Sequence, residues 1–190
     1  MTRIVSPVVM ALMLALVVAL GACTPVKPKP PLTELAIRAR FTPEHTATAL
    51  AKIPIAATRL AIERHLAERE LNARPRRVII DDARVGETID AGGGIALERV
   101  FVLFHEFDAR GFTTYLEGIE VIAGRRHNAY RLRVGASEPN RTELTEIDAV
   151  DLNRVFLRRF VPKAGDLPCC PTDIQTPSFV LTPNALEPLP

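Results

Sequence analysis

Two adjacent cysteines, Cys169 and Cys170, are the residues best suited to chemistry, and they stand between Pro168 and Pro171. Adjacent cysteines can close a disulfide within a small ring, at a cost in backbone strain. Three hypotheses stay open: a structural disulfide between the two, two thiols or disulfides to another chain, and a redox or metal-binding pair. Catalytic dithiols normally use Cys-x-x-Cys at a helix N-terminus, a setting that the flanking prolines oppose. We therefore favour the structural disulfide.

Histidines and carboxylates show no metal-ligand pattern. His105 and Glu106 are neighbours in a predicted strand, where they face opposite sides and cannot share one ion. The helical motif of zinc proteases, with two histidines four residues apart, is missing. His45, His65 and His127 are scattered without ligand spacing. The sequence therefore predicts no metal site and no cofactor.

Two further patterns fall short of catalytic motifs. The run Gly92-Gly93-Gly94 is not followed by Lys and Ser or Thr, so it indicates a flexible turn rather than a phosphate-binding loop. The serines of the mature chain, Ser137 and Ser178, lack the Gly-x-Ser-x-Gly setting of hydrolase nucleophiles. The sequence thus does not decide whether the protein is an enzyme, and the missing motifs favour a protein without enzymatic activity.

The composition is that of a globular protein. Of 190 residues, 47% are hydrophobic and 24% are charged, which excludes a wholly disordered chain. The formal net charge is only +2, whereas nucleic-acid binders are usually strongly basic, so we expect no nucleic-acid partner. No apolar run long enough to cross a bilayer follows residue 22.

The N-terminus has the features of an export signal. Arg3 precedes an apolar run over residues 8–20, which ends in Leu20-Gly21-Ala22-Cys23. This tetrapeptide resembles the lipobox of bacterial lipoproteins. The resemblance implies that residues 1–22 are a signal peptide, and that Cys23 becomes the N-terminus carrying diacylglycerol and an acyl chain such as palmitate. It also implies that Thr24, which is not the Asp of inner-membrane retention, favours the periplasmic face of the outer membrane.

The cysteine pair also lies within a recognisable stretch. Gly165-Asp166-Leu167-Pro168-Cys169-Cys170-Pro171 resembles C-terminal segments of small exported bacterial proteins. Free thiols are uncommon in an oxidising compartment. If Cys23 is acylated, as the lipobox resemblance implies, Cys169 and Cys170 are left as partners for each other.

Four segments are expected along the chain. The signal peptide is followed by a lipidated, proline-rich linker at residues 23–32, which favours an extended, semi-rigid tether. A folded domain is predicted for residues 33–161. A proline-rich tail with the Cys-Cys turn follows at residues 162–190 and is predicted to be mostly irregular, with an edge strand at 178–181.

The first part of the domain reads as a strand and two helices. Alternating apolar residues predict a strand over residues 35–41. Thr42 and Pro43 are typical of a helix start, and Pro54 predicts a break. The main helix is predicted over residues 55–73. It carries two apolar stripes, which indicate burial on both sides within the domain or a face for a partner.

The rest of the domain reads mainly as strands. Strands are predicted over residues 77–81, 97–107, 112–122 and 129–134, the last three forming an antiparallel meander because their connections are short. The continuous apolar run in 97–107 predicts a strand that is covered on both faces. A helix is expected near residues 143–154 and a strand near 155–161.

This order of elements predicts an α+β fold. We expect a two-layer sandwich, in which one main helix packs on an antiparallel sheet of about four to five strands. The expected function is that of a membrane-anchored periplasmic lipoprotein, a non-catalytic binding or assembly component with an envelope protein as partner. Two alternatives stay open. One is a redox or metal-binding protein using Cys169 and Cys170, and the other is a hydrophobic-ligand carrier with an apolar cavity between helix and sheet.

Overall fold

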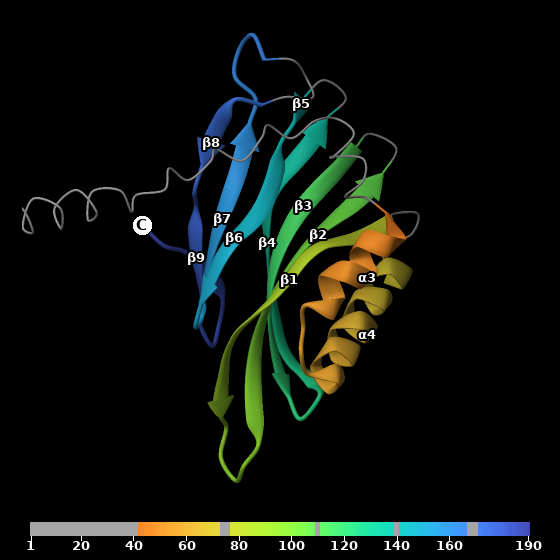
Figure 1. The fold of residues 1–190 in the computed structure, drawn as a ribbon, viewed down its shortest axis with the longest axis vertical. Helices are drawn as coiled ribbons and strands as arrows, with labels where there is room; N and C mark the ends of the chain where they lie inside the picture. The colour runs from red at the N-terminus through yellow and green to blue at the C-terminus, as the bar shows by residue number, and fades with distance from the viewer. Residues whose placement is uncertain (1–41, 73–76, 109–110, 139–140, 167–170) are drawn as a thin grey trace, which may run out of the picture. The chain divides into compact units, whose positions relative to one another are not determined.

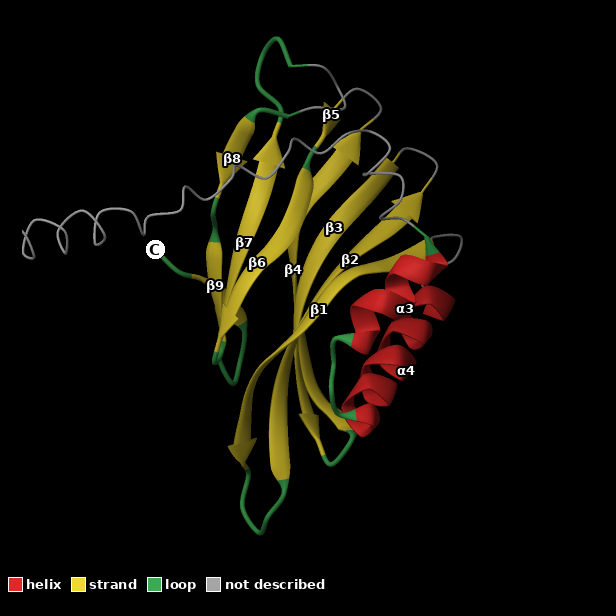
Figure 2. Ribbon diagram, in the orientation of Figure 1, coloured by secondary structure: helices red, strands yellow, loops and turns green. Residues whose placement is uncertain are grey.

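Two helices and two antiparallel sheets make up the part of the chain that the structure, a computed structural model, describes: residues 42–72, 77–108, 111–138, 141–166 and 171–190 (Figures 1 and 2). The α+β class is therefore confirmed, with strand as the predominant element. The lipobox, the linker, the strand expected at residues 35–41 and the pair Cys169-Cys170 lie outside the described residues.

The helices begin and end as the sequence predicts. α3 spans Pro43–Ala51, and the side-chain oxygen of Thr42 caps it by accepting a hydrogen bond from the backbone N–H of His45 at 3.2 Å. The break at Pro54 is confirmed, because α4 starts beyond it and spans Ala56–Asn72. Neither helix is long and apolar enough to cross a bilayer, nor is any other helix of the described residues.

The first sheet is a meander of five strands in chain order. They are β1 (Arg77–Asp90), β2 (Ala96–Asp108), β3 (Gly111–Ile122), β4 (Arg125–Glu138) and β5 (Arg141–Thr142). The predicted hairpins are confirmed, although β1 and β4 are much longer than expected. A register shift between Ile80 and Asp82 leaves Asp81 as an extra residue in β1. This bulge redirects side chains toward α3, as described below.

The second sheet comes from the C-terminal part of the chain. It contains β6 (Leu144–Asp151), β7 (Arg154–Val161), β8 (Asp173–Gln175), β9 (Ser178–Leu181) and β10 (Leu186–Pro188). The order is β10-β9-β7-β6, and β8 also pairs with β7. The strand expected at residues 178–181 is confirmed, but it is not at an edge, since β9 lies between β7 and β10.

One prediction for this region is wrong. The helix expected near residues 143–154 is strand β6, which forms a hairpin with β7 through a turn in which Leu152 has φ of 53°. Thr145, Ile147 and Val150 are β-branched and fit a strand better than a helix. Most described residues of the C-terminal tail lie outside strands, as predicted, but the tail contributes three short strands where one was expected, because its segments between prolines can still pair with β7 and with one another.

The first sheet has a core on each face. On one face, Val100, Val102 and Phe104 of β2 pack with residues of α3 and α4. On the other face, Phe101 and Leu103 pack with residues of the second sheet. Figure 1 shows the helices and the second sheet on opposite sides of β1–β4. The helix-covered sheet was expected, whereas the second sheet was not, and it explains why β2 is apolar on both faces.

The two sheets approach each other closely at Gly118. A Cβ atom at Gly118 of β3 would lie 2.8 Å from Cδ1 of Leu181 in β9. Leu181 is fully buried in the core between the sheets. Gly118 therefore makes room for the leucine, and a larger residue there would separate the sheets.

The two stripes of α4 differ in their environment. Ile62 and Leu66 are buried against the first sheet. Leu60 and Leu71 of the other stripe remain 45% and 62% exposed, so these two residues are not buried within the described domain. Burial on both sides of the helix is therefore wrong at Leu60 and Leu71, although Ile53, which belongs to the same predicted stripe, is fully buried.

Candidate functional site

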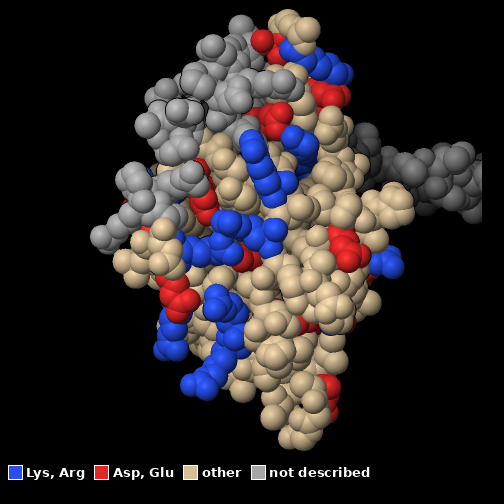
Figure 3. All heavy atoms as spheres, turned by 180° about the vertical axis from the view of Figure 1, so that it is seen from behind, with Lys and Arg blue, Asp and Glu red and all other residues tan. Residues whose placement is uncertain are grey.

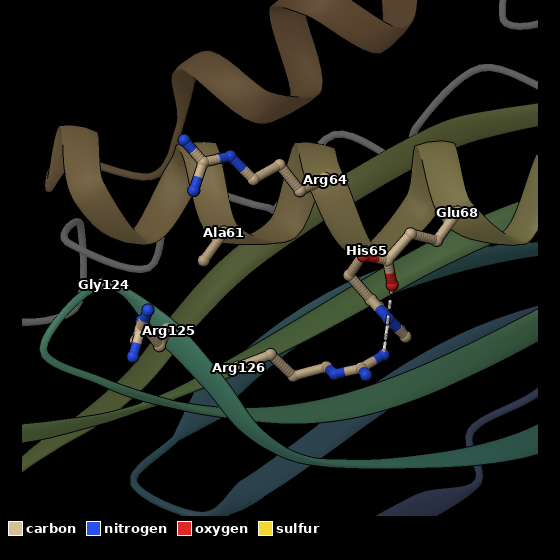
Figure 4. Close-up of a pocket in the computed structure, with 7 residues that line it drawn as sticks. All are labelled: Ala61, Arg64, His65, Glu68, Gly124, Arg125 and Arg126. Atoms are coloured by element: carbon tan, nitrogen blue, oxygen red, sulfur yellow. Dashed lines mark hydrogen bonds and ion pairs between the residues drawn. The ribbon is translucent and has the colours of Figure 1, made fainter.

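A cleft of about 220 Å³ opens between α4 and the turn that joins β3 to β4 (Figure 4). Its lining is mostly polar and basic. The lining residues are Ala61, Arg64, His65, Glu68, Gly124, Arg125 and Arg126. Successive turns of α4 supply one wall, and the turn with the first residues of β4 supplies the other.

A two-residue turn fixes the second wall. Ala123 has φ of 49° and Gly124 has φ of 71°, which is the left-handed backbone of a tight hairpin turn. A Cβ atom at Gly124 would lie only 2.9 Å from the Cβ of Ala57. The turn thus lies directly against the start of α4, and glycine is required both for its backbone and for this contact.

His65 forms the buried end of the cleft. Its Nδ1 is hydrogen-bonded to Nη1 of Arg126, and its Nε2 lies 3.1 Å from Oε1 of Glu117. A guanidinium only donates hydrogen bonds, so Nδ1 must accept. Nε2 also lies 3.4 Å from Nε of Arg69, so a guanidinium faces each nitrogen of the ring. The hydrogen bond to Nδ1 orients Arg126 along the cleft.

Glu117 contacts His65 from the side of the first sheet. Its side chain is fully buried on β3, and Nη2 of Arg69 also donates to its Oε1. The guanidinium of Arg69 lies 5.7 Å from the ring centre of Phe104, which adds a cation–π contact. Oε2 of Glu117 has no hydrogen-bond partner among the described residues. Oε1 of Glu117 therefore contacts both His65 and Arg69.

The arginines of the cleft differ in their pairing. Arg126 lies 3.9 Å from Oε2 of Glu68 in addition to its contact with His65. Arg64 and Arg125 are exposed and have no ion-pair partner within the described part of the chain. Figure 4 shows Arg126 extended toward His65 and Glu68, with Arg125 beside Gly124. The cleft thus carries more positive than negative charge.

Further basic residues continue along β4. Arg131 and Arg133 are exposed on this strand. Nη1 of Arg131 donates to Oε1 of Glu106 at 2.8 Å, and its guanidinium lies 4.5 Å from the ring centre of Tyr115. Figure 3 shows lysine and arginine gathered in a band on the back of the molecule. Arg131 therefore already has an ion-pair partner, whereas Arg64 and Arg125 have none among the described residues.

A second polar cluster joins α3 to the bulge in β1. Nε2 of His45 lies 2.7 Å from the backbone oxygen of Asp81 and 3.1 Å from its Oδ1. Nε2 of His105 lies 3.6 Å from Oδ2 of the same residue, and its Nδ1 lies 2.9 Å from Oγ1 of Thr114. Only the bulge at Asp81 brings the two histidines together, so no sequence spacing could reveal it. The described residues contain no group of three potential ligands suited to a metal ion.

One buried carboxylate lies under α4. Glu98 of β2 is 4% exposed and accepts a hydrogen bond at Oε2 from Oγ1 of Thr58, while its Oε1 has no partner among the described residues. Removal from water raises the pKa of Glu98 above its ordinary value of 4.5. This side chain lies inside the fold and contributes no group to the cleft.

The flanks of the cysteine pair are held by Asp166. Its carboxylate accepts hydrogen bonds from the backbone N–H of Lys163 at 2.7 Å and of Thr172 at 2.9 Å. These bonds, first that of Lys163, lower the pKa of Asp166. The acidic residue of the Gly-Asp-x-x-Cys-Cys-Pro stretch thus bonds to Lys163 and to Thr172, which lie on either side of it in the sequence.

The remaining predicted residues take ordinary structural places. Gly92, Gly93 and Gly94 lie in the turn between β1 and β2, where a turn was predicted, and all three have positive φ. Ser178 begins β9, and His127 is exposed on β4. The cleft was missed by the sequence analysis because His65 showed no ligand spacing and Arg125-Arg126 is an ordinary pattern for a turn.

Comparisons with protein families, with curated proteins and with solved structures found no match for this chain.

Proposed function

We propose that the protein is a membrane-anchored periplasmic lipoprotein that serves as a non-catalytic binding or assembly component of the cell envelope. The anchor is the acylated Cys23 that the lipobox resemblance implies, and the proline-rich linker separates the folded domain from the bilayer. Thr24 favours the periplasmic face of the outer membrane. The cleft between α4 and the β3–β4 turn is the surface with which the domain binds its envelope partner.

The observation that carries this proposal is the cleft, where Arg64 and Arg125 lie exposed without ion-pair partners among the described residues. Arginines serve well in recognition because their planar group makes several hydrogen bonds to an anionic partner. His65 and Glu68 contact Arg126 and restrict its position, which reduces the entropy lost on binding. These features suit binding of a negatively charged group.

The two alternatives lack such an observation. A redox or metal role would rest on Cys169 and Cys170, which lie outside the described residues. A hydrophobic-ligand carrier would need an apolar cavity between helix and sheet, but buried side chains such as Ile62 and Phe104 occupy that interface. We therefore keep the binding role as the proposal.

The proposal is tested on the full-length protein in its native membrane. Mass spectrometry of membrane-extracted protein should find an N-terminal peptide that starts at Cys23 and carries lipid. A pull-down should then recover an envelope component with the wild type, and recover less of it with Arg64→Glu/Arg125→Glu. Equal recovery would contradict the assignment of the cleft, and a soluble, unmodified protein would contradict the anchor.

A further inference from the structure

The charge balance of the cleft defines the ligand that it can hold. Arg64, Arg125 and Arg126 bring three positive charges and Glu68 brings one negative charge, so the surplus is two. A ligand that neutralises the cleft therefore carries about two negative charges.

Phosphate fits this requirement better than a carboxylate. A phosphate monoester carries about −1.5 to −2 charge near pH 7 and offers three strong acceptor oxygens, whereas a carboxylate carries one charge on two oxygens. Guanidinium groups bind phosphate through paired N–H donors. The volume of about 220 Å³ equals roughly seven waters at ~30 Å³ each, enough for a phosphate group and the first atoms that it esterifies.

The cleft is also arranged before any ligand enters. Arg126 is held by His65 and Glu68, and the contact of Gly124 with Ala57 fixes the turn next to Arg125. Arg64 and Arg125 have no internal ion pair among the described residues that a ligand would have to break. Both conditions lower the free energy that binding must supply.

We infer that this cleft binds a phosphate group, either as inorganic phosphate or as the phosphate of a lipid headgroup, through Arg64, Arg125 and Arg126. The inference rests on the binding role proposed for the cleft and names the chemical group that the cleft recognises. Arg64 and Arg125 supply the uncompensated charge. Arg126 supplies the fixed donor, with His65 as the residue that positions it.

Titration calorimetry with inorganic phosphate tests the inference on the full-length protein in maltoside micelles at constant ionic strength. Wild type should bind phosphate with a Kd of about 1 mM or below. Arg64→Gln/Arg125→Gln should weaken binding at least about tenfold. Arg154→Gln is the matched control, since Arg154 is an exposed arginine of β7 that does not line the cleft, and it should bind like wild type.

Acetate and lipids complete the test. Acetate should bind much more weakly than phosphate. Short-chain phosphatidic acid, compared with short-chain phosphatidylcholine, identifies the source: binding tighter than that of inorganic phosphate indicates a headgroup, and equal or weaker binding indicates free phosphate. The inference is overturned if neither phosphate nor phosphatidic acid binds, if acetate binds as well, or if the double variant binds like Arg154→Gln.

These measurements are independent of the proposed anchor and partner. Phosphate binding in micelles needs neither acylated Cys23 nor an envelope component, so a failure of the membrane experiments leaves the result intact. Conversely, a protein that is lipidated and recovers a partner yet binds no phosphate contradicts only the ligand assigned here.

Discussion

Nε2 of His65 on α4 lies 3.1 Å from Oε1 of Glu117 on β3, and both side chains are buried. This contact joins the helix layer to the first sheet at the base of the cleft. Glu117 also forms an ion pair with Arg69, and it thereby neutralises the positive charge of this arginine between α4 and the sheet.

Glu117→Ala should therefore destabilise the protein strongly. Removing one partner of a fully buried charge pair costs about 3–5 kcal/mol, and the cost here should be lower because the side chain of Arg69 is 22% exposed and can be solvated. The measurement is urea unfolding followed by circular dichroism. Glu63→Ala on the exposed face of α4 is the control and should change the free energy of unfolding by at most about 0.5 kcal/mol. A cost below about 1 kcal/mol for Glu117→Ala would show that the contact contributes little.

Glu98 should make the protein less stable as the pH rises. Its pKa is raised in the folded state, so between 4.5 and the raised value the folded protein binds more protons than the unfolded chain. Stability from this group is thus present at low pH and lost as the pH rises through that interval. Glu98→Gln should remove this dependence, and at pH 7 it should be at least as stable as wild type.

The check is a series of unfolding curves from pH 4 to pH 8 for wild type, Glu98→Gln and the exposed control Glu63→Gln. Glu98→Gln should change the slope of the unfolding free energy against pH, whereas Glu63→Gln should leave it as in wild type. A loss of more than about 1 kcal/mol in Glu98→Gln at pH 7 would mean that the ionised carboxylate is stabilising through its bond with Thr58.

Asp166 should behave in the opposite way. Its pKa is lowered by the backbone N–H groups of Lys163 and Thr172, so its stabilising effect is present above its ordinary value of 3.8 and is lost as the pH falls through the lowered value. Asp166→Asn should weaken this acid dependence and speed hydrogen exchange at the Thr172 amide. Asp151→Asn, at an exposed acid of β6, serves as the comparison and should alter neither. Unchanged hydrogen exchange at the Thr172 amide in Asp166→Asn would contradict the hydrogen bond between Asp166 and Thr172.

Gly118→Ala should destabilise the contact between the two sheets. The added Cβ meets Leu181 at 2.8 Å, and overpacking of this kind costs about 1–3 kcal/mol. The matched background is Leu181→Ala, in which the methyl group has room and the cost of Gly118→Ala should largely disappear. A double-mutant cycle on unfolding free energies measures this coupling. Additive effects would show that the two residues do not limit each other.

Local signals were enough to predict much of the fold. Thr42 and Pro43 marked the start of α3, Pro54 marked the break, and the alternation of β2–β4 with their short connections predicted a meander. Such features depend on a few neighbouring residues, whose backbone preferences are similar in any context. The prediction for residues 143–154 was wrong because capping and strand signals overlap there, and pairing with β7 decides between them.

The sequence by itself thus determined the α+β class, the boundaries of α3 and α4 and the meander, and it predicts a lipidated N-terminus from the lipobox resemblance of Leu20-Gly21-Ala22-Cys23. Only the tertiary structure decided that a second sheet covers β2, that a bulge at Asp81 joins His45 to His105, and that His65 meets Arg126 and Glu117. The physical reason is separation along the chain. His65 and Arg126 are 61 residues apart, and their contact depends on how α4 packs on β3 and β4, which no local pattern of residues encodes.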